Sequence, residues 1–188
     1  MDGGKEILTW DDFGAGARVL AQQIVDSGFD PDVMIAVARG GMIPTGAISY
    51  ALGKKLNDCI NVEFYIDAGR RPTWDGSPGE AEGAAVAGEA DRGEVQTLPD
   101  PVLLPPLLDA ESLEGKRLLV VDDVVDSGRT MALVQKLLRG FGAEVRTCVL
   151  YAKPTTVVVP DYVWRRTDKW IVFPWSAEPP VVAMKRGE

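Results

Sequence analysis

The chain has 188 residues, which suits a single domain with a substantial hydrophobic core. Its net charge of −8, from 28 acidic and 20 basic residues, argues against a nonspecific nucleic-acid surface, which needs a basic face. The absence of histidine excludes a Ser–His–Asp triad and any histidine-ligated zinc, so a general base must be Asp, Glu, Lys, Tyr or Cys.

The sequence carries no sign of membrane insertion or export. No apolar stretch reaches the roughly 18 residues that a membrane span needs, and the first residues lack the basic-then-apolar layout of a signal peptide. We therefore expect a cytoplasmic protein with no membrane partner. Cys59 and Cys148 lie far apart inside apolar stretches, so we expect two buried thiols and no disulfide.

The first third of the chain alternates between helical and strand patterns. Apolar residues at helical spacing follow Thr9 or Asp11 as N-cap, and a run without polar alternation is typical of a strand buried on both faces. The expected elements are a helix from Thr9 to Gly28, a strand Val33–Ala38, a turn Arg39–Pro44, a helix Thr45–Leu52 and a strand Ile60–Ile66.

Residues 69–100 differ in composition, with many Gly, Ala and Glu residues and almost no large apolar side chains. The segment is long for a loop, so we expect it to be functional or disordered. Order resumes at Val102–Leu108. A strand Lys116–Asp122, a helix from about Thr130 to Arg139 and a strand Val145–Tyr151 follow, then a Pro- and Trp-rich tail.

Repeated strand–loop–helix units predict an α/β fold with a mainly parallel central sheet flanked by helices. We expect residues 1–188 to form one domain. Its core covers about residues 5–150, and a small C-terminal hood lobe covers about residues 151–188.

The segment from Leu118 to Thr130 predicts a sugar-phosphate site. Its apolar run leads into two carboxylates, Asp122 and Asp123, which can accept hydrogen bonds from vicinal ribose hydroxyls or hold Mg²⁺ through water. The small and hydroxylated residues that follow allow backbone N–H groups to converge on a phosphate. This phosphate loop consists of Asp126, Ser127, Gly128, Arg129 and Thr130.

A second loop, Arg39-Gly40-Gly41, follows the strand Val33–Ala38. Glycines permit close backbone approach, and an arginine can bind two phosphate oxygens at once. The pattern alone also fits a structural turn.

The run LLVVDDVVDSGRT resembles the phosphoribosyl-pyrophosphate (PRPP) signature of type I phosphoribosyltransferases, and it fits neither a Walker A loop nor a Rossmann fingerprint. The resemblance implies that the phosphate loop binds the 5′-phosphate of PRPP and that Asp122 and Asp123 bind its ribose. It also implies that Arg39, Gly40 and Gly41 bind the pyrophosphate, with Mg²⁺ as cofactor. A homodimer or homotetramer is common in this family.

The tail is similar to the purine-binding hood of the 6-oxopurine subgroup, which includes the bacterial xanthine–guanine phosphoribosyltransferases. The matching motifs are Tyr151–Pro154, Asp161-Tyr162 and Lys169–Trp175. By this resemblance, Lys153 contacts the exocyclic 6-oxygen, Trp170 stacks on the purine and Ile171 belongs to the base site. Alternatively, Trp170 and still more Trp175 serve only to pack the lobe. The chain departs from the subgroup at Val172 and Ser176, where the resembled enzymes have polar and acidic residues.

These features predict an enzyme that transfers phosphoribose from PRPP to hypoxanthine, guanine or xanthine, with Asp126 as general base at the purine N7. The segment 69–100 is expected to close over the site and exclude water. Two alternatives stay open. One is a phosphoribosyltransferase for another nucleobase, and the other is a catalytically silent PRPP- or nucleotide-sensing regulator.

Overall fold

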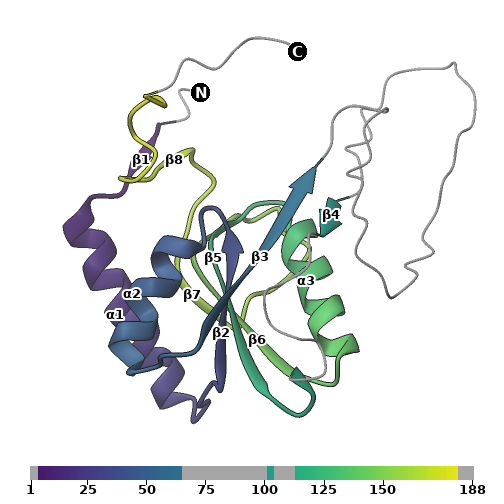
Figure 1. The fold of residues 1–188 in the computed structure, drawn as a ribbon. Helices are drawn as coiled ribbons and strands as arrows, with labels where there is room; N and C mark the ends of the chain where they lie inside the picture. The colour runs from purple at the N-terminus through teal and green to yellow at the C-terminus, as the bar shows by residue number, and fades with distance from the viewer. Residues whose placement is uncertain (1–3, 65–100, 104–112, 182–188) are drawn as a thin grey trace, which may run out of the picture.

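The computed structural model describes residues 4–64, 101–103 and 113–181 (Figure 1). The segment 69–100 lies outside the described residues, as does most of Val102–Leu108. The helices are α1 (Trp10–Asp26), α2 (Met42–Leu52) and α3 (Arg129–Gly140). The strands are β1 (Glu6–Ile7), β2 (Val33–Ala38), β3 (Asn57–Phe64), β4 (Pro101–Leu103), β5 (Arg117–Val125), β6 (Glu144–Ala152), β7 (Tyr162–Arg166) and β8 (Ile171–Val172).

A six-stranded sheet in the order β4-β3-β2-β5-β6-β7 forms the centre of the molecule. All its pairings are parallel except that of β3 with β4, which is antiparallel. The central register places Val33 opposite Leu118 and Val121 opposite Cys148. The expected mainly parallel α/β sheet is thereby confirmed.

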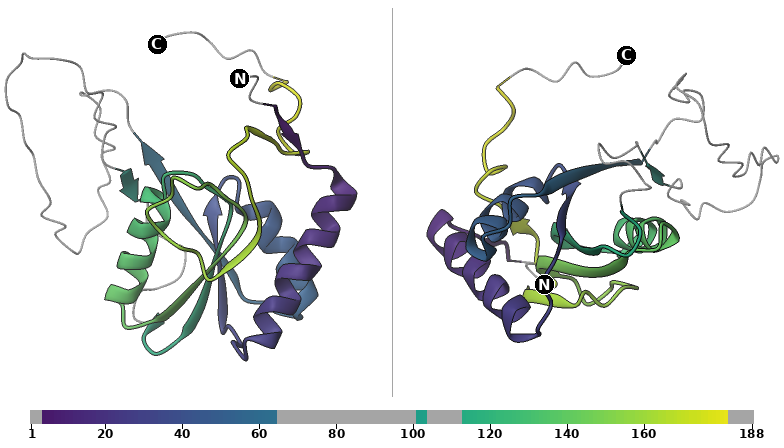
Figure 2. Two further views of the ribbon diagram at one scale, coloured as in Figure 1. Left: turned by 180° about the vertical axis from the view of Figure 1, so that it is seen from behind. Right: turned by 60° about the horizontal axis from the view of Figure 1, so that its bottom comes forward.

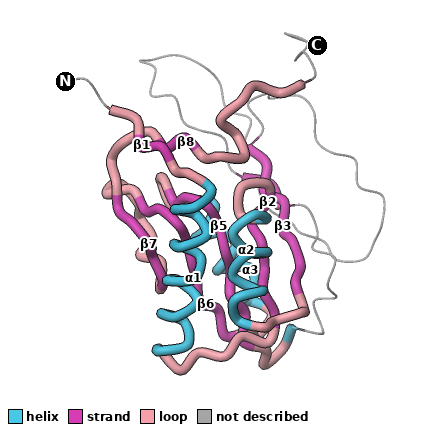
Figure 3. The backbone as a smooth tube through the Cα atoms, turned by 90° about the vertical axis from the view of Figure 1, so that its left-hand side faces the viewer, coloured by secondary structure: helices cyan, strands magenta, loops and turns pink. Residues whose placement is uncertain are grey.

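Helices cover both faces of this sheet, which explains why its central strands show no polar alternation. Helices α1 and α2 lie side by side on one face (Figure 3), and α3 lies on the other (Figure 2). One apolar cluster joins α1 and α2 to side chains such as Met34 and Leu119, while the other joins α3 to Ile35 and Val120. Neighbouring residues of one strand thus enter opposite clusters.

Several elements begin or end away from their expected bounds; strand β3, for example, begins at Asn57 and not at Ile60. Strand β5 continues to Val125, so Asp122 and Asp123 lie within the strand, because their backbone still pairs with β6 as far as Ala152. Helix α2 begins at Met42 and contains Pro44 in its first turn, where a missing N–H costs no helical hydrogen bond.

The hood is built from both ends of the described chain. Strand β1 pairs in parallel with β8, and the pair lies beyond the carboxyl ends of the core strands (Figure 1). The N–H of Glu6 donates to the carbonyl of Trp170 at 2.8 Å, and the N–H of Leu8 donates to that of Val172 at 3.0 Å. Strand β7, from the region expected for the hood, instead extends the main sheet beside β6.

Both cysteines are free thiols, as expected. Cys148 is buried and Cys59 is partly buried, and desolvation raises the pKa of each. Within the described part of the chain, no helix is both long and apolar enough to cross a bilayer.

Candidate active site

The predicted site residues follow strands β2, β5 and β6 at their carboxyl ends, the edge where open α/β sheets bind ligands. Arg39 follows β2, Asp122 and Asp123 lie in the last part of β5, and Lys153 follows β6. The parallel register between β2, β5 and β6 brings these ends to one edge. The fold therefore gathers at one edge residues that are far apart in the sequence.

The loop Arg39-Gly40-Gly41 connects β2 to the first turn of α2, with Gly41 as N-cap. The N–H of Gly41 donates to the carbonyl of Val37 at 2.9 Å, and the hydroxyl of Thr45 donates to the carbonyl of Gly41 at 2.6 Å. Arg39 itself is exposed. The backbone is thus anchored to the core while the guanidinium reaches solvent, where it can bind an anion.

Gly40 and Gly41 must be glycines because neighbouring atoms leave no space for a Cβ atom at either position. A Cβ on Gly41 would lie 2.6 Å from the carbonyl oxygen of Val37, and one on Gly40 would overlap the carboxylate of Asp123. The loop Arg39-Gly40-Gly41 and Asp123 of β5 are therefore in close contact.

Asp122 and Asp123 form an electrostatically strained pair. The N–H of Asp123 donates to Oδ1 of Asp122 at 2.9 Å. Desolvation, together with the charge of Asp123, raises the pKa of Asp122 well above its ordinary value, and desolvation also raises that of Asp123. Hydroxyl donors or a cation would relieve this strain, which suits a site for ribose hydroxyls.

The phosphate loop has the geometry of an anion site. Gly128 adopts a φ of 82° and is the N-cap of α3, whose first helical hydrogen bond runs from Ala132 to Gly128 at 2.9 Å. The N–H groups of the intervening turn therefore have no partner within the helix. They border a pocket of about 320 Å³ whose lining includes every predicted phosphate-loop residue, from Asp126 to Thr130.

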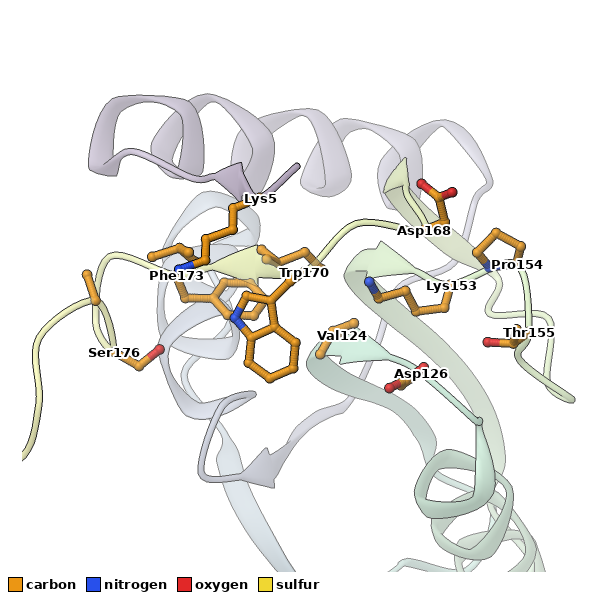
Figure 4. A pocket seen from close by; sticks show the side chains of 13 residues that line it. Lys5, Val124, Asp126, Lys153, Pro154, Thr155, Asp168, Trp170, Phe173 and Ser176 are labelled. Atoms are coloured by element: carbon orange, nitrogen blue, oxygen red, sulfur yellow. The ribbon is translucent and has the colours of Figure 1, made fainter. Parts of the chain in front are cut away.

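A larger pocket of about 880 Å³ lies between the end of β5 and the hood (Figure 4). Trp170, with 72% of its surface exposed, stands in it, and Lys153 points toward it from the opposite wall. The ammonium of Lys153 donates to the carbonyl of Lys169. The backbone N–H of Lys153 donates to the carbonyl of Val125 at 2.9 Å. The pocket thus offers an aromatic face and a cation to a flat polar ligand.

The other predicted hood residues have different surroundings. Ile171 lines the pocket, but its side chain is 8% exposed and belongs to the core, so mainly its backbone is available to a ligand. Trp175 stacks on Phe173 at a centroid distance of 4.9 Å and packs edge-on against Phe13 at 5.3 Å. Trp175 therefore packs against neighbouring aromatic rings, and its side chain also forms a hydrogen bond with Asp123 that partly offsets the raised pKa of that carboxyl. Exposed Trp170, by contrast, is free to stack on a ligand.

Several residues that line this pocket were not predicted from the sequence as site residues, among them Lys5, Thr155 and Asp168. Lys5 enters because β1 pairs with β8. A two-residue strand has no periodicity that would have revealed this pairing. Thr155 and Asp168 lie close in sequence to Lys153 and Trp170, and that proximity is the only signal that could have marked them.

A family model described as "Phosphoribosyl transferase domain" matches residues 3–180. The chain belongs to the phosphoribosyltransferase family. Xanthine-guanine phosphoribosyltransferase of Gluconobacter oxydans is 29% identical over 186 residues, covering 96% of this chain and 92% of that protein. The protein of the same name from Ruegeria sp. is 30% identical over 189 residues, covering 96% of this chain and 90% of that protein.

Solved structures resemble this phosphoribosyltransferase along nearly its whole length. The crystal structure of a purine phosphoribosyltransferase from Pyrococcus horikoshii is 35% identical with a TM-score of 0.69, covering 98% of this chain and all of the other. The xanthine-guanine-hypoxanthine phosphoribosyltransferase of Helicobacter pylori, at 20% identity and a TM-score of 0.65, shares the fold. The expected family is confirmed.

Proposed function

We propose that this phosphoribosyltransferase transfers the phosphoribosyl group of PRPP to a 6-oxopurine in purine salvage, giving a nucleoside monophosphate and pyrophosphate. One observation carries the proposal. Asp126 lines both the phosphate pocket and the pocket that contains Trp170 and Lys153. A ribose 5′-phosphate seated in the first pocket therefore extends toward the second, where a base would have to meet its C1 carbon.

The donor end of this proposal uses the phosphate loop, the acidic pair of β5 and the loop Arg39-Gly40-Gly41. The phosphate loop binds the 5′-phosphate through backbone N–H groups and the hydroxyls of Ser127 and Thr130. Asp122 and Asp123 accept hydrogen bonds from the ribose hydroxyls. Arg39 and the backbone of Gly40 and Gly41 bind the pyrophosphate and stabilise its growing charge as it leaves.

The acceptor end uses the hood pocket. Trp170 stacks on the purine, an interaction that contributes about 1–3 kcal/mol per base. The ammonium of Lys153 leaves its backbone partner, the carbonyl of Lys169, and donates to the 6-oxygen. Asp126, at the junction of the two pockets, takes the proton from N7 as the base attacks C1. The same surroundings support a 6-oxopurine more than a pyrimidine, because the pocket is large and has an aromatic floor.

The donor set fits Mg²⁺ carried by the substrate. Among the described residues, no three His, Cys, Asp or Glu side chains gather as a metal cluster. Asp122 and Asp123 supply two neighbouring carboxylates, and Mg²⁺ is commonly held by one or two carboxylates together with phosphate oxygens and water. When bound, Mg²⁺ would neutralise charge on the pyrophosphate.

Pyrophosphate release from PRPP and Mg²⁺ over a panel of nucleobases tests the function. We expect turnover with 6-oxopurines, and about a 100-fold or greater loss of kcat in Asp126→Asn with PRPP binding retained. Asp26→Asn, at the far end of α1, is the matched control and should behave as wild type. Release with no base despite PRPP binding would favour the sensing regulator, and release only with other bases would favour a different acceptor.

We further propose a cytoplasmic homo-oligomer, a dimer or tetramer. Helix α2 exposes large apolar side chains, with Met42 at 52%, Ile43 at 39% and Tyr50 at 91% of their surfaces accessible. Such a patch is more typical of an interface than of a free surface. Light scattering on the eluting protein measures its mass, and a monomer would contradict the proposal.

A further inference from the structure

The hood pocket has two cationic side chains, and the proposed function uses only Lys153. The other is Lys5, which precedes β1. The hydrogen bond from Glu6 N–H to the Trp170 carbonyl, 2.8 Å long, holds this end of the chain beside the pocket. Lys5 therefore stays in the wall of the pocket for as long as the hood is formed.

The charges of the pocket are divided between its two sides. Figure 4 shows Lys5 and Ser176 on one side of Trp170, with Lys153, Asp126 and Asp168 on the other. Both acidic side chains in the lining thus stand on the Lys153 side. The side with Lys5 offers a cation and a hydroxyl, and no carboxylate is among the described residues that line it.

The carboxylate next to Lys5 in sequence is engaged elsewhere. Glu6 lies 3.8 Å from Arg165, and successive residues of an extended segment point to opposite faces. None of the ion pairs between residues that the structure describes involves Lys5. The ammonium of Lys5 is therefore available to a ligand in the pocket.

The orientation of a purine in this pocket determines what Lys5 meets. With the 6-oxygen at Lys153 and N7 at Asp126, the C2 edge of the six-membered ring is turned away from both residues. That edge then faces Lys5 and Ser176. Lys5 carries only hydrogen-bond donors. A 2-oxygen accepts such donors, whereas a 2-amino group presents further donors and finds no carboxylate there.

We infer that Lys5 determines base specificity, selecting a purine with a 2-oxygen, such as xanthine, over one with a 2-amino group, such as guanine. The inference rests on the proposed function, because it assumes a 6-oxopurine bound with that orientation. Hypoxanthine has only hydrogen at C2, so it reports on the reaction without engaging Lys5.

The experiment compares kcat/KM for xanthine, guanine and hypoxanthine in wild type, Lys5→Met, Ser176→Asp and Lys136→Met. Lys136 is an exposed residue of α3 and controls for loss of one positive charge. We expect wild type to favour xanthine over guanine. Lys5→Met should lower kcat/KM for xanthine about tenfold, as expected for a lost hydrogen bond to a charged donor, mainly through KM. Its effect on hypoxanthine should be small.

Ser176→Asp tests the same idea by adding the missing acceptor. The new carboxylate should pair with Lys5 and accept from a 2-amino group, so the guanine-to-xanthine ratio should rise. Equal losses for all three bases in Lys5→Met would indicate a structural role and overturn the inference. So would a wild-type preference for guanine. Failure of the proposed function is distinct, since it would show as no turnover of hypoxanthine by wild type.

Discussion

Gly40, after β2, lies against the carboxylate of Asp123, at the end of β5, so closely that a Cβ on residue 40 would fall 2.7 Å from Oδ1 of Asp123. The loop proposed to bind the pyrophosphate is thus in contact with the carboxylate of β5 proposed to bind the ribose before any ligand arrives. Their relative position is fixed by the parallel pairing of β2 with β5. Such preorganisation favours a ligand that spans both loops.

Gly40→Ala should therefore reduce PRPP turnover strongly, with kcat/KM falling about 100-fold, because the methyl group must displace Asp123 or the loop. Steady-state kinetics and calorimetric titration of PRPP measure the effect. Gly46→Ala is the control, since a Cβ there meets nothing within 4 Å. Unchanged PRPP binding in Gly40→Ala would show that the contact between the loops is not needed.

Two glycines of α1 should respond in opposite directions to the same substitution. A Cβ on Gly14 meets nothing within 4 Å, so Gly14→Ala should stabilise the protein by about 0.5–1 kcal/mol through helix propensity. A Cβ on Gly16 would lie 2.8 Å from the Trp164 ring, so Gly16→Ala should destabilise it by about 1–3 kcal/mol. Urea unfolding monitored by circular dichroism gives both values, and equal effects would refute the packing argument.

Asp122→Asn should stabilise the ligand-free protein at neutral pH. Because the folded protein raises the pKa of Asp122, the unfolded chain ionises first, near pH 3.9, and wild-type stability falls as pH rises from there through the folded value. Asparagine does not ionise, so the stability of the variant does not fall with pH for this reason. Thermal unfolding from pH 3 to pH 8 should show a difference in Tm that grows with pH, while PRPP binding weakens. A constant difference would contradict the titration of Asp122.

Tyr151 and Tyr162 provide a paired test of buried hydroxyls. The hydroxyl of Tyr151 is buried and makes no hydrogen bond of standard length and angle among the described residues, and burial together with the nearby carboxylate of Glu6 raises its pKa to about 12. Tyr151→Phe should therefore be neutral or slightly stabilising. The hydroxyl of Tyr162 lies 2.6 Å from that of Ser27 and accepts from Arg146 at 2.8 Å, so Tyr162→Phe should cost about 1–2 kcal/mol. Denaturant unfolding of both variants decides whether the two hydroxyls differ in this way.

Features that can be read from contiguous residues were enough to predict the central strands and the phosphate loop. The apolar runs of β2 and β5 identified buried strands because residues such as Val37 and Val120 need no polar alternation between two covered faces. The phosphate loop was predictable because its small residues are contiguous. The structure places all of its predicted residues around one pocket.

What the sequence did not reveal depends on pairing between distant segments. Strand β1 has two residues, and its partner β8 lies near the other end of the described chain, so neither piece carries a detectable period. For that reason Lys5 was not predicted to reach the pocket. The continuation of β5 beyond Asp122 to Val125 was also missed, because two adjacent charged residues are a poor local signal for a strand that pairing with β6 sustains.

The parallel pairing of β1 with β8 has an evolutionary consequence. The loops proposed to bind PRPP are anchored in the central sheet, whereas the wall facing the base is assembled from two short strands that lie outside that sheet. Substitutions in those segments can alter the choice of base while leaving the PRPP-binding loops unchanged. Acceptor preference can therefore diverge among related enzymes faster than donor chemistry, and the residues at the chain's margins are where such divergence should be sought.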